Sequence, residues 1–281
     1  MNIAFWSNSY ERSCAFYNFV AISIASVLRY PYTVTTLENF LGSDNIARAF
    51  LGENIRNHIR EGVTGFYEGS GIEGLLRRIY RGDNCPSILR GYWQEVIPNH
   101  LYYIPKGGVI NSELFDYELN YNLKELLGII KKNSDLCYIN ITQQNHLSSK
   151  AILHEADLIV INLYQNPDYL DYFFNNYSSL IHKSIFVIGN YSRSSPMSCK
   201  RISRYYDIPL ENISPIPYNE YFSIVCRYGG AKEFINSNYH CLKDSPNYLF
   251  IHGIRKATFA IAKKLEESLA LGKEEIESCS I

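Results

Sequence analysis

Short apolar runs that alternate with helix-forming stretches constrain the fold of this 281-residue chain more than any other feature of its sequence. Turn residues bound each run, and stretches with helical periodicity separate the runs. This alternation is typical of a parallel sheet covered by helices on both faces, so it predicts a doubly wound α/β fold. About seven runs are expected to form its strands, at residues 2–6, 32–37, 101–104, 135–141, 157–163, 184–188 and 213–216.

The helical stretches complete a single predicted domain over residues 1–281. Hydrophobic residues make up 46% of the chain, which is enough to bury one large core. The expected helices include an apolar one from Cys14 to about Arg29, and others at 44–60, 71–81, 114–132 and about 256–270, followed by an exposed tail. Arg77, Arg78 and Arg81 lie near one helix end, where they form either solvated charge or a patch that binds a partner or a phosphate.

Charge and cysteine usage exclude several function classes. The 27 basic and 28 acidic residues give no basic field, so nonspecific DNA binding is not predicted. The seven cysteines are odd in number and form no C-x-x-C pair, which argues against zinc and against a disulfide framework. No apolar run is long enough for a transmembrane segment, and no signal peptide is recognisable. We therefore expect a cytoplasmic protein.

The segment Ser7–Ser13 lies where a nucleotide-binding α/β domain places its phosphate-binding loop, between the first strand and a long helix. A working loop needs glycines for close approach and a lysine for the phosphates. Here no glycine occurs between residues 1 and 41, and Glu11 would face phosphate oxygens of like charge. At ~4 Å and an effective dielectric near 20, that repulsion is about 4 kcal/mol. The segment is equally consistent with a plain strand-turn-helix.

Later segments add to this pattern: the apolar strand Asp135–Asn140, the strand and turn Phe186–Tyr191, and the loop Ile216–Asn219. With the loop, and in this order, they resemble the ParA/MinD family of deviant Walker A ATPases, in particular the pilus-localisation branch of TadZ and CpaE. The resemblance implies a P-loop NTPase fold. It also places Asn140 at the position of the Walker B aspartate, where an amide would weaken metal binding and hydrolysis.

The resemblance implies a set of site residues. In the loop, the residues that would contact ATP or ADP are Ser9, Tyr10, Glu11, Arg12, Ser13 and Cys14. Asn190 would read the adenine edge, and Pro217 and Tyr218 would pack on the other side of the base. If magnesium binds, Ser13 and Glu38 would be its ligands. We expect binding of Mg²⁺ and nucleotide to be weak or absent.

These departures from the family pattern predict a degenerate ParA/MinD-type protein with weak or no ATP hydrolysis. It would act as a homodimeric localisation or assembly factor with protein partners in a Flp pilus or secretion machine, recruited by a partner to the membrane or the cell pole. Two alternatives remain open: an atypical but active ATPase that uses Arg12, Ser13 and Glu38, and a DNA-partition-type protein. A further alternative is a different α/β enzyme with His146 or His154 as the base and Cys137 as the nucleophile.

Overall fold

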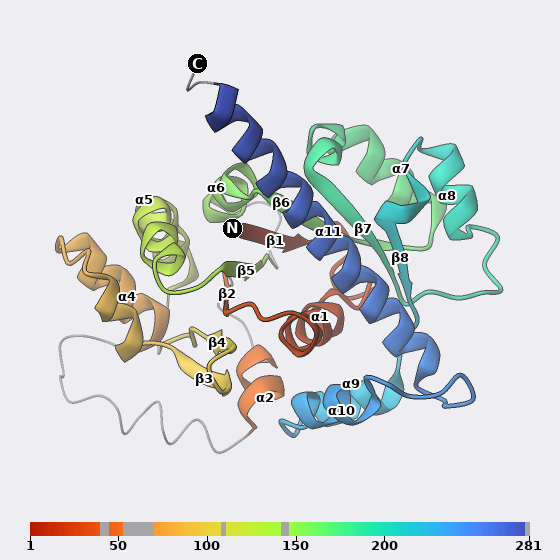
Figure 1. Ribbon diagram of the computed structural model, residues 1–281, viewed down its shortest axis with the longest axis horizontal. Coiled ribbons are helices and arrows are strands. Elements are labelled where there is room, and N and C mark those ends of the chain that lie inside the picture. The colour runs from red at the N-terminus through yellow and green to blue at the C-terminus, as the bar shows by residue number, and fades with distance from the viewer. Residues whose placement is uncertain (40–44, 53–69, 108–110, 142–145, 279–281) are drawn as a thin grey trace.

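The computed structural model describes residues 1–39, 45–52, 70–107, 111–141 and 146–278. Their strands are β1 Asn2–Trp6, β2 Val34–Glu38, β3 Gln94–Ile97, β4 Leu101–Tyr103, β5 Leu136–Asn140, β6 Leu158–Tyr164, β7 Ser184–Gly189 and β8 Ile213–Ile216. They form one eight-stranded sheet in the order β3-β4-β2-β5-β1-β6-β7-β8 (Figure 1). Every neighbouring pair is parallel except β3 and β4, so the predicted doubly wound α/β fold is confirmed.

Helices cover both faces of the sheet (Figure 1). One face carries α1 Ala15–Arg29, α2 Asn45–Leu51, α9 Glu220–Cys226, α10 Ala231–Asn238 and α11 Tyr248–Ser278. The other carries α4 Gly71–Tyr80, α5 Ser112–Lys131, α6 Leu147–Glu155, α7 Pro167–Asn176 and α8 Cys199–Tyr205. Within the same described ranges, three short 3-10 helices lie at Pro86–Gly91, Ser178–Lys183 and Leu210–Asn212.

Strand β1 shows how the sequence divides its apolar residues between the two cores. Ile3 and Phe5 pack into the core under α1, while Ala4 and Trp6 pack into the core under α5 and α7. Phe5 lies edge-on to Phe19 of α1 with ring centroids 5.0 Å apart. Because successive side chains of a strand point to opposite faces, a shift of one residue would exchange these two sets. The division of these side chains between the two cores therefore fixes the register of the central strand.

Two predicted boundaries and one strand need correction. The helix expected over 44–60 is α2, which ends at Leu51, and residues 53–69 lie outside the described part of the chain. The helix expected at about 256–270 begins at Tyr248 and ends at Ser278, so most of the expected tail is helical. Position 253 inside this helix is a glycine. A Cβ there would lie 2.2 Å from the Pro215 carbonyl oxygen of β8, so a larger residue does not fit without a shift. Strand β3 was not predicted.

In the described part of the chain, no helix has both the length and the apolar character needed to cross a membrane.

Candidate functional site

The predicted site residues lie along one edge of the sheet, because parallel strands all end on the same side. The loop 7–14 follows β1, and Glu38 and Asn140 are the last residues of β2 and β5. Asn190 follows β7, and Pro217 follows β8. The topology thus brings together residues that are far apart in the sequence.

The loop after β1 is closed by its own hydrogen bonds. The amides of Ser13, Cys14 and Ala15 each donate to a carbonyl oxygen earlier in the loop, at 2.9, 3.1 and 3.0 Å. The Ser9 amide donates to Ser7 Oγ at 3.0 Å. Cys14 has a left-handed backbone with φ of 54°, although it is not a glycine. Four amides at the place where a P-loop presents N–H groups to phosphate therefore already have acceptors.

Buried polar contacts also join this loop to the neighbouring strands. Ser7 Oγ lies 2.9 Å from Ser13 Oγ and donates to the Asn162 carbonyl at 2.6 Å. Asn18 Nδ2 donates to the Ser13 carbonyl at 3.1 Å and to Asn162 Oδ1 at 3.0 Å. A Cβ at Gly189 would lie only 1.7 Å from the Ser13 carbonyl oxygen. The loop is thus packed tightly against β6 and β7.

Glu11 and Arg12 face solvent rather than the interior of the loop. The Arg12 guanidinium lies 5.5 Å from the ring centroid of Tyr169 on α7, in a cation–π contact. Asn8 Nδ2 donates to the Tyr169 carbonyl at 2.8 Å, which ties the loop to the same helix. The exposure of Glu11 relieves the repulsion expected from the sequence, and the contact with Tyr169 directs Arg12 toward α7.

Tyr10 reaches from the loop to the end of β5. Asn140 Nδ2 donates to the Tyr10 hydroxyl oxygen at 2.7 Å. Burial raises the pKa of Tyr10, and the nearby carboxylate of Glu38 adds to this effect. The phenol therefore stays neutral at physiological pH, and the Asn140 amide faces a tyrosine hydroxyl.

A buried ion pair lies beside this contact. Lys106 Nζ is 3.2 Å from Glu38 Oε1, with the two side chains 4% and 5% exposed. Glu38 Oε1 also accepts a hydrogen bond from the Tyr103 hydroxyl at 3.1 Å. Close to Lys106, the buried Glu73 carboxylate accepts a hydrogen bond from the Gly107 amide. Burial raises the pKa of Glu73, while that amide and the charge of Lys106 act in the opposite direction.

Lys106 is the main site residue that the sequence reasoning missed. A signal for it was present, because the lysine comes two residues after the predicted strand 101–104 and so had to lie near the edge that carries Glu38. The pairing itself depends on neighbouring strands, since β2 lies between β4 and β5 in the sheet.

The residues expected around an adenine base lie at the ends of neighbouring strands, since the last residues of β7 and β8 are paired. Asn190 is exposed and has a left-handed backbone with φ of 49°. Pro217 is half-buried, and Tyr218 is 50% exposed. The Tyr218 hydroxyl lies 2.8 Å from Ser223 Oγ, and its ring lies edge-on to Tyr17. This end of the sheet thus exposes an amide and an aromatic ring on adjacent strands.

The expected metal ligands have separate partners in the described residues: Ser13 contacts Ser7, and Glu38 contacts Lys106. The described part of the chain contains no group of three or more His, Cys, Asp or Glu side chains that could hold a metal ion. Cys137 is buried in β5, and burial raises the pKa of its thiol to about 12, which is typical of an inert cysteine.

Solved structures share this architecture. A ParA family ATPase from Chlorobium tepidum TLS matches with a TM-score of 0.64 and 13% identity, over 92% of this chain and 98% of that chain. MinD in the MinC:MinD cell division complex of Aquifex aeolicus matches with a TM-score of 0.64 and 12% identity, over 93% and 96% of the two chains. This chain has the ParA/MinD fold. Neither a family model nor a curated protein matches its sequence.

A third structure with the ParA/MinD fold is the septum site-determining protein MinD from Pyrococcus horikoshii OT3, which is complexed with Mg-ADP. It matches with a TM-score of 0.61 and 13% identity, over 92% of this chain and 93% of that chain. The residues after β1 in this chain do not fit such a group: the loop has no lysine, the amides of Ser9, Ser13, Cys14 and Ala15 already have acceptors, and Asn140 carries no charge.

Proposed function

We propose that this protein is a degenerate relative of the ParA/MinD ATPases that acts through binding and dimerisation, as a localisation or assembly factor with weak or no ATP hydrolysis. The observation that carries the proposal is the closed loop after β1, whose amides donate to oxygens of the loop itself. Assignment to a Flp pilus or secretion apparatus rests on the sequence resemblance to TadZ and CpaE.

The electrostatics of the site support the loss of hydrolysis. Phosphoryl transfer relies on positioning and on cations that neutralise the developing charge. The only cation in the loop, Arg12, lies over Tyr169, and the buried Lys106 pairs with Glu38. Adenine nucleotide and Mg²⁺ therefore bind weakly or not at all in this proposal.

A binding role agrees with how the fold is used elsewhere, since one protein with this fold is part of a MinC:MinD complex. We propose that this chain forms a homodimer and binds a protein partner of a secretion or pilus machine. The partner would recruit it from the cytoplasm to the membrane or the cell pole. Its net charge of -1 gives no support to a DNA-partition role.

Calorimetric titration with ATP and Mg²⁺, with a phosphate-release assay on the same sample, tests the proposal. We expect no turnover and a heat signal that is weak or absent. Magnesium-dependent turnover that Arg12→Ala abolishes would replace the proposal with the atypical ATPase. Turnover that persists unchanged in Arg12→Ala and Ser13→Ala would indicate a contaminating enzyme. Light scattering after size-exclusion chromatography tests the dimer, and a strict monomer at high concentration would contradict it.

A further inference from the structure

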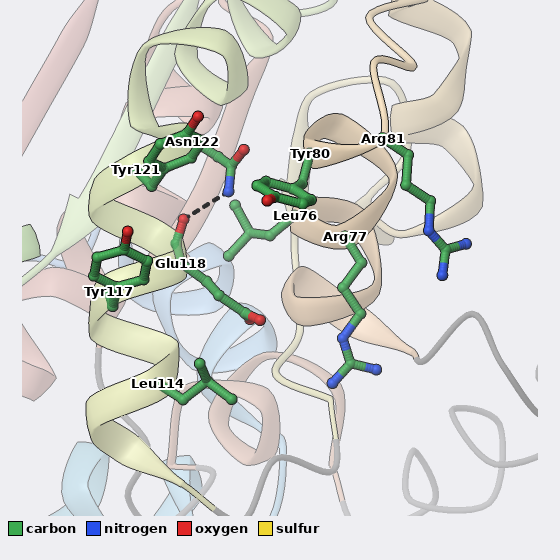
Figure 2. A pocket seen from close by; sticks show the side chains of 9 residues that line it. All are labelled: Leu76, Arg77, Tyr80, Arg81, Leu114, Tyr117, Glu118, Tyr121 and Asn122. Carbon is green, nitrogen blue, oxygen red and sulfur yellow. Dashed lines mark hydrogen bonds between the residues drawn. The ribbon is translucent and has the colours of Figure 1, made fainter.

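A groove of about 650 Å³ lies between α4 and α5. The side chains that line it come from these two helices and from Arg81, the residue after α4 (Figure 2). Leu76 and Tyr80 of α4 point toward α5, and Leu114, Tyr117 and Tyr121 of α5 line the other side. None of these residues belongs to the loop after β1. The groove is therefore separate from the site described above.

The groove exposes aromatic surface. Tyr80, Tyr117 and Tyr121 are 70%, 57% and 61% exposed, and Leu114 is 49% exposed. The rings of Tyr80 and Tyr121 have centroids 5.7 Å apart, and those of Tyr117 and Tyr121 are stacked at 6.3 Å. The three tyrosines thus form a continuous row. Contiguous exposed apolar patches mark interaction sites, and tyrosine is enriched at their centres.

The spacing along the helices suits a helical occupant. On α5 the lining residues 114, 117, 118 and 121 form one stripe with helical periodicity. At 1.5 Å per residue the stripe is about 10 Å long, which matches two turns of a third helix. Such a segment would place an apolar stripe between two packed helices, a common mode of peptide recognition.

The charges at the rim restrict the occupant further. Arg77 of α4 and Arg81, which directly follows the last residue of α4, are exposed and lie about one turn apart. Both line the groove, and Figure 2 shows them on its α4 rim with their side chains directed away from α5. Arg78, which lies between them, is paired with Asp83. Within the described ranges neither Arg77 nor Arg81 forms an ion pair, so both are available to a partner carboxylate. Among the described residues, Glu118 is the one carboxylate that lines the groove, and it belongs to the α5 wall.

We propose that this groove binds an amphipathic helical segment of a partner protein. The apolar stripe of the segment lies on the tyrosine row, and two of its carboxylates, one turn apart, pair with Arg77 and Arg81. Its other flank, which faces Glu118, is neutral or basic. The inference rests on the proposed binding function and gives it a location and a partner chemistry. Its test uses no nucleotide, so it can fail independently of the loop-based proposal.

The test is selection of helical 16-residue peptides from a display library on the full chain, followed by fluorescence anisotropy of the enriched peptides. We expect an apolar i, i+3, i+4, i+7 stripe with Asp or Glu on one flank. Binding should weaken at least tenfold in Tyr117→Ser/Tyr121→Ser and in Arg77→Glu/Arg81→Glu. Replacing the acidic flank of the peptide by lysine should restore binding to the arginine variant.

A matched control is Arg204→Glu/Tyr205→Ser on α8, which alters an exposed arginine and a tyrosine that is 70% exposed. This variant should bind the peptides as the wild type does. All the substituted side chains are exposed, so circular dichroism and urea midpoints should stay unchanged. Failure to enrich any peptide, a basic flank in the enriched set, or equal binding to the groove variants would overturn the proposal.

A second copy of this chain is the competing occupant, and sedimentation velocity distinguishes it. Self-association that Tyr117→Ser/Tyr121→Ser abolishes would show that the groove is a homodimer interface and would overturn the assignment to a partner. A dimer that persists in that variant uses another surface and leaves the groove free for the proposed partner, as we expect.

Discussion

Replacing Lys106 by methionine would remove the cation that faces Glu38 at 3.2 Å inside the protein. At that distance and an effective dielectric near 20, the attraction between the two charges is about 5 kcal/mol. Removing one partner of a buried ion pair costs about 3–5 kcal/mol, because the remaining charge is left uncompensated. The Tyr103 hydroxyl still donates to Glu38, so we expect Lys106→Met to lower the free energy of unfolding by about 3 kcal/mol.

The assay is urea unfolding followed by tryptophan fluorescence and circular dichroism together, which checks two-state behaviour. A double-mutant cycle with Glu38→Gln should give a coupling energy of about 2 kcal/mol or more, because the double variant leaves no unpaired charge at position 38. Lys124→Met is the control: that lysine is 77% exposed and 3.7 Å from Glu155, so its loss should cost less than about 1 kcal/mol. Additive effects in the cycle, or a loss for Lys106→Met as small as the control's, would refute the reasoning.

Three further predictions concern the loop and its neighbours. Gly189→Ala should lower stability by about 1–3 kcal/mol, since the added methyl would overlap a loop carbonyl. Gly128→Ala, at an open helical position, should raise stability by about 0.5–1 kcal/mol. Thermal unfolding that ranks the two variants equally would contradict this. Tyr10→Phe should cost about 1–3 kcal/mol in urea unfolding, because Asn140 loses a buried acceptor, and an unchanged midpoint would argue against that contact. The pKa of Glu73 is raised above its ordinary value of 4.5, so the stability that its protonated form contributes is full below pH 4.5 and is lost as pH rises through the folded-state pKa. Glu73→Gln should therefore become more stable relative to the wild type as pH rises across that window. A stability difference that does not change with pH would contradict this prediction.

The alternation of apolar runs with helical stretches was sufficient to predict the parallel strands. Each central strand is buried on both faces and therefore forms a continuous apolar run in the sequence. Strand β3 escaped detection because it is an edge strand of four residues, Gln94–Ile97, of which only Val96 is buried. The start of α11 was missed for a different reason. Gly253 weakens the helical pattern of the sequence. It is needed for close packing against Pro215 of β8, and that tertiary contact cannot be read from the sequence.

The candidate site was predictable in outline only. Because parallel strands end at one edge, the loop, Glu38 and Asn140 had to lie near one another. Their partners could not be predicted, since the bond between Tyr10 and Asn140 joins residues 130 positions apart. The closure of the loop likewise depends on which oxygens its amides reach, and residue types alone do not determine that.

The closed loop after β1 also sets a limit on how any anion could be captured there. A ligand that needs the amides of Ser9, Ser13, Cys14 and Ala15 can bind only protein molecules in which these amides have lost their present acceptors. At about 1 kcal/mol for each broken hydrogen bond, opening costs about 4 kcal/mol, so roughly one molecule in a thousand is competent. The apparent dissociation constant then rises about a thousandfold over its intrinsic value. Grafting a lysine into the loop would leave this factor in place, so regaining phosphate affinity would require rebuilding the backbone path as well as its charge.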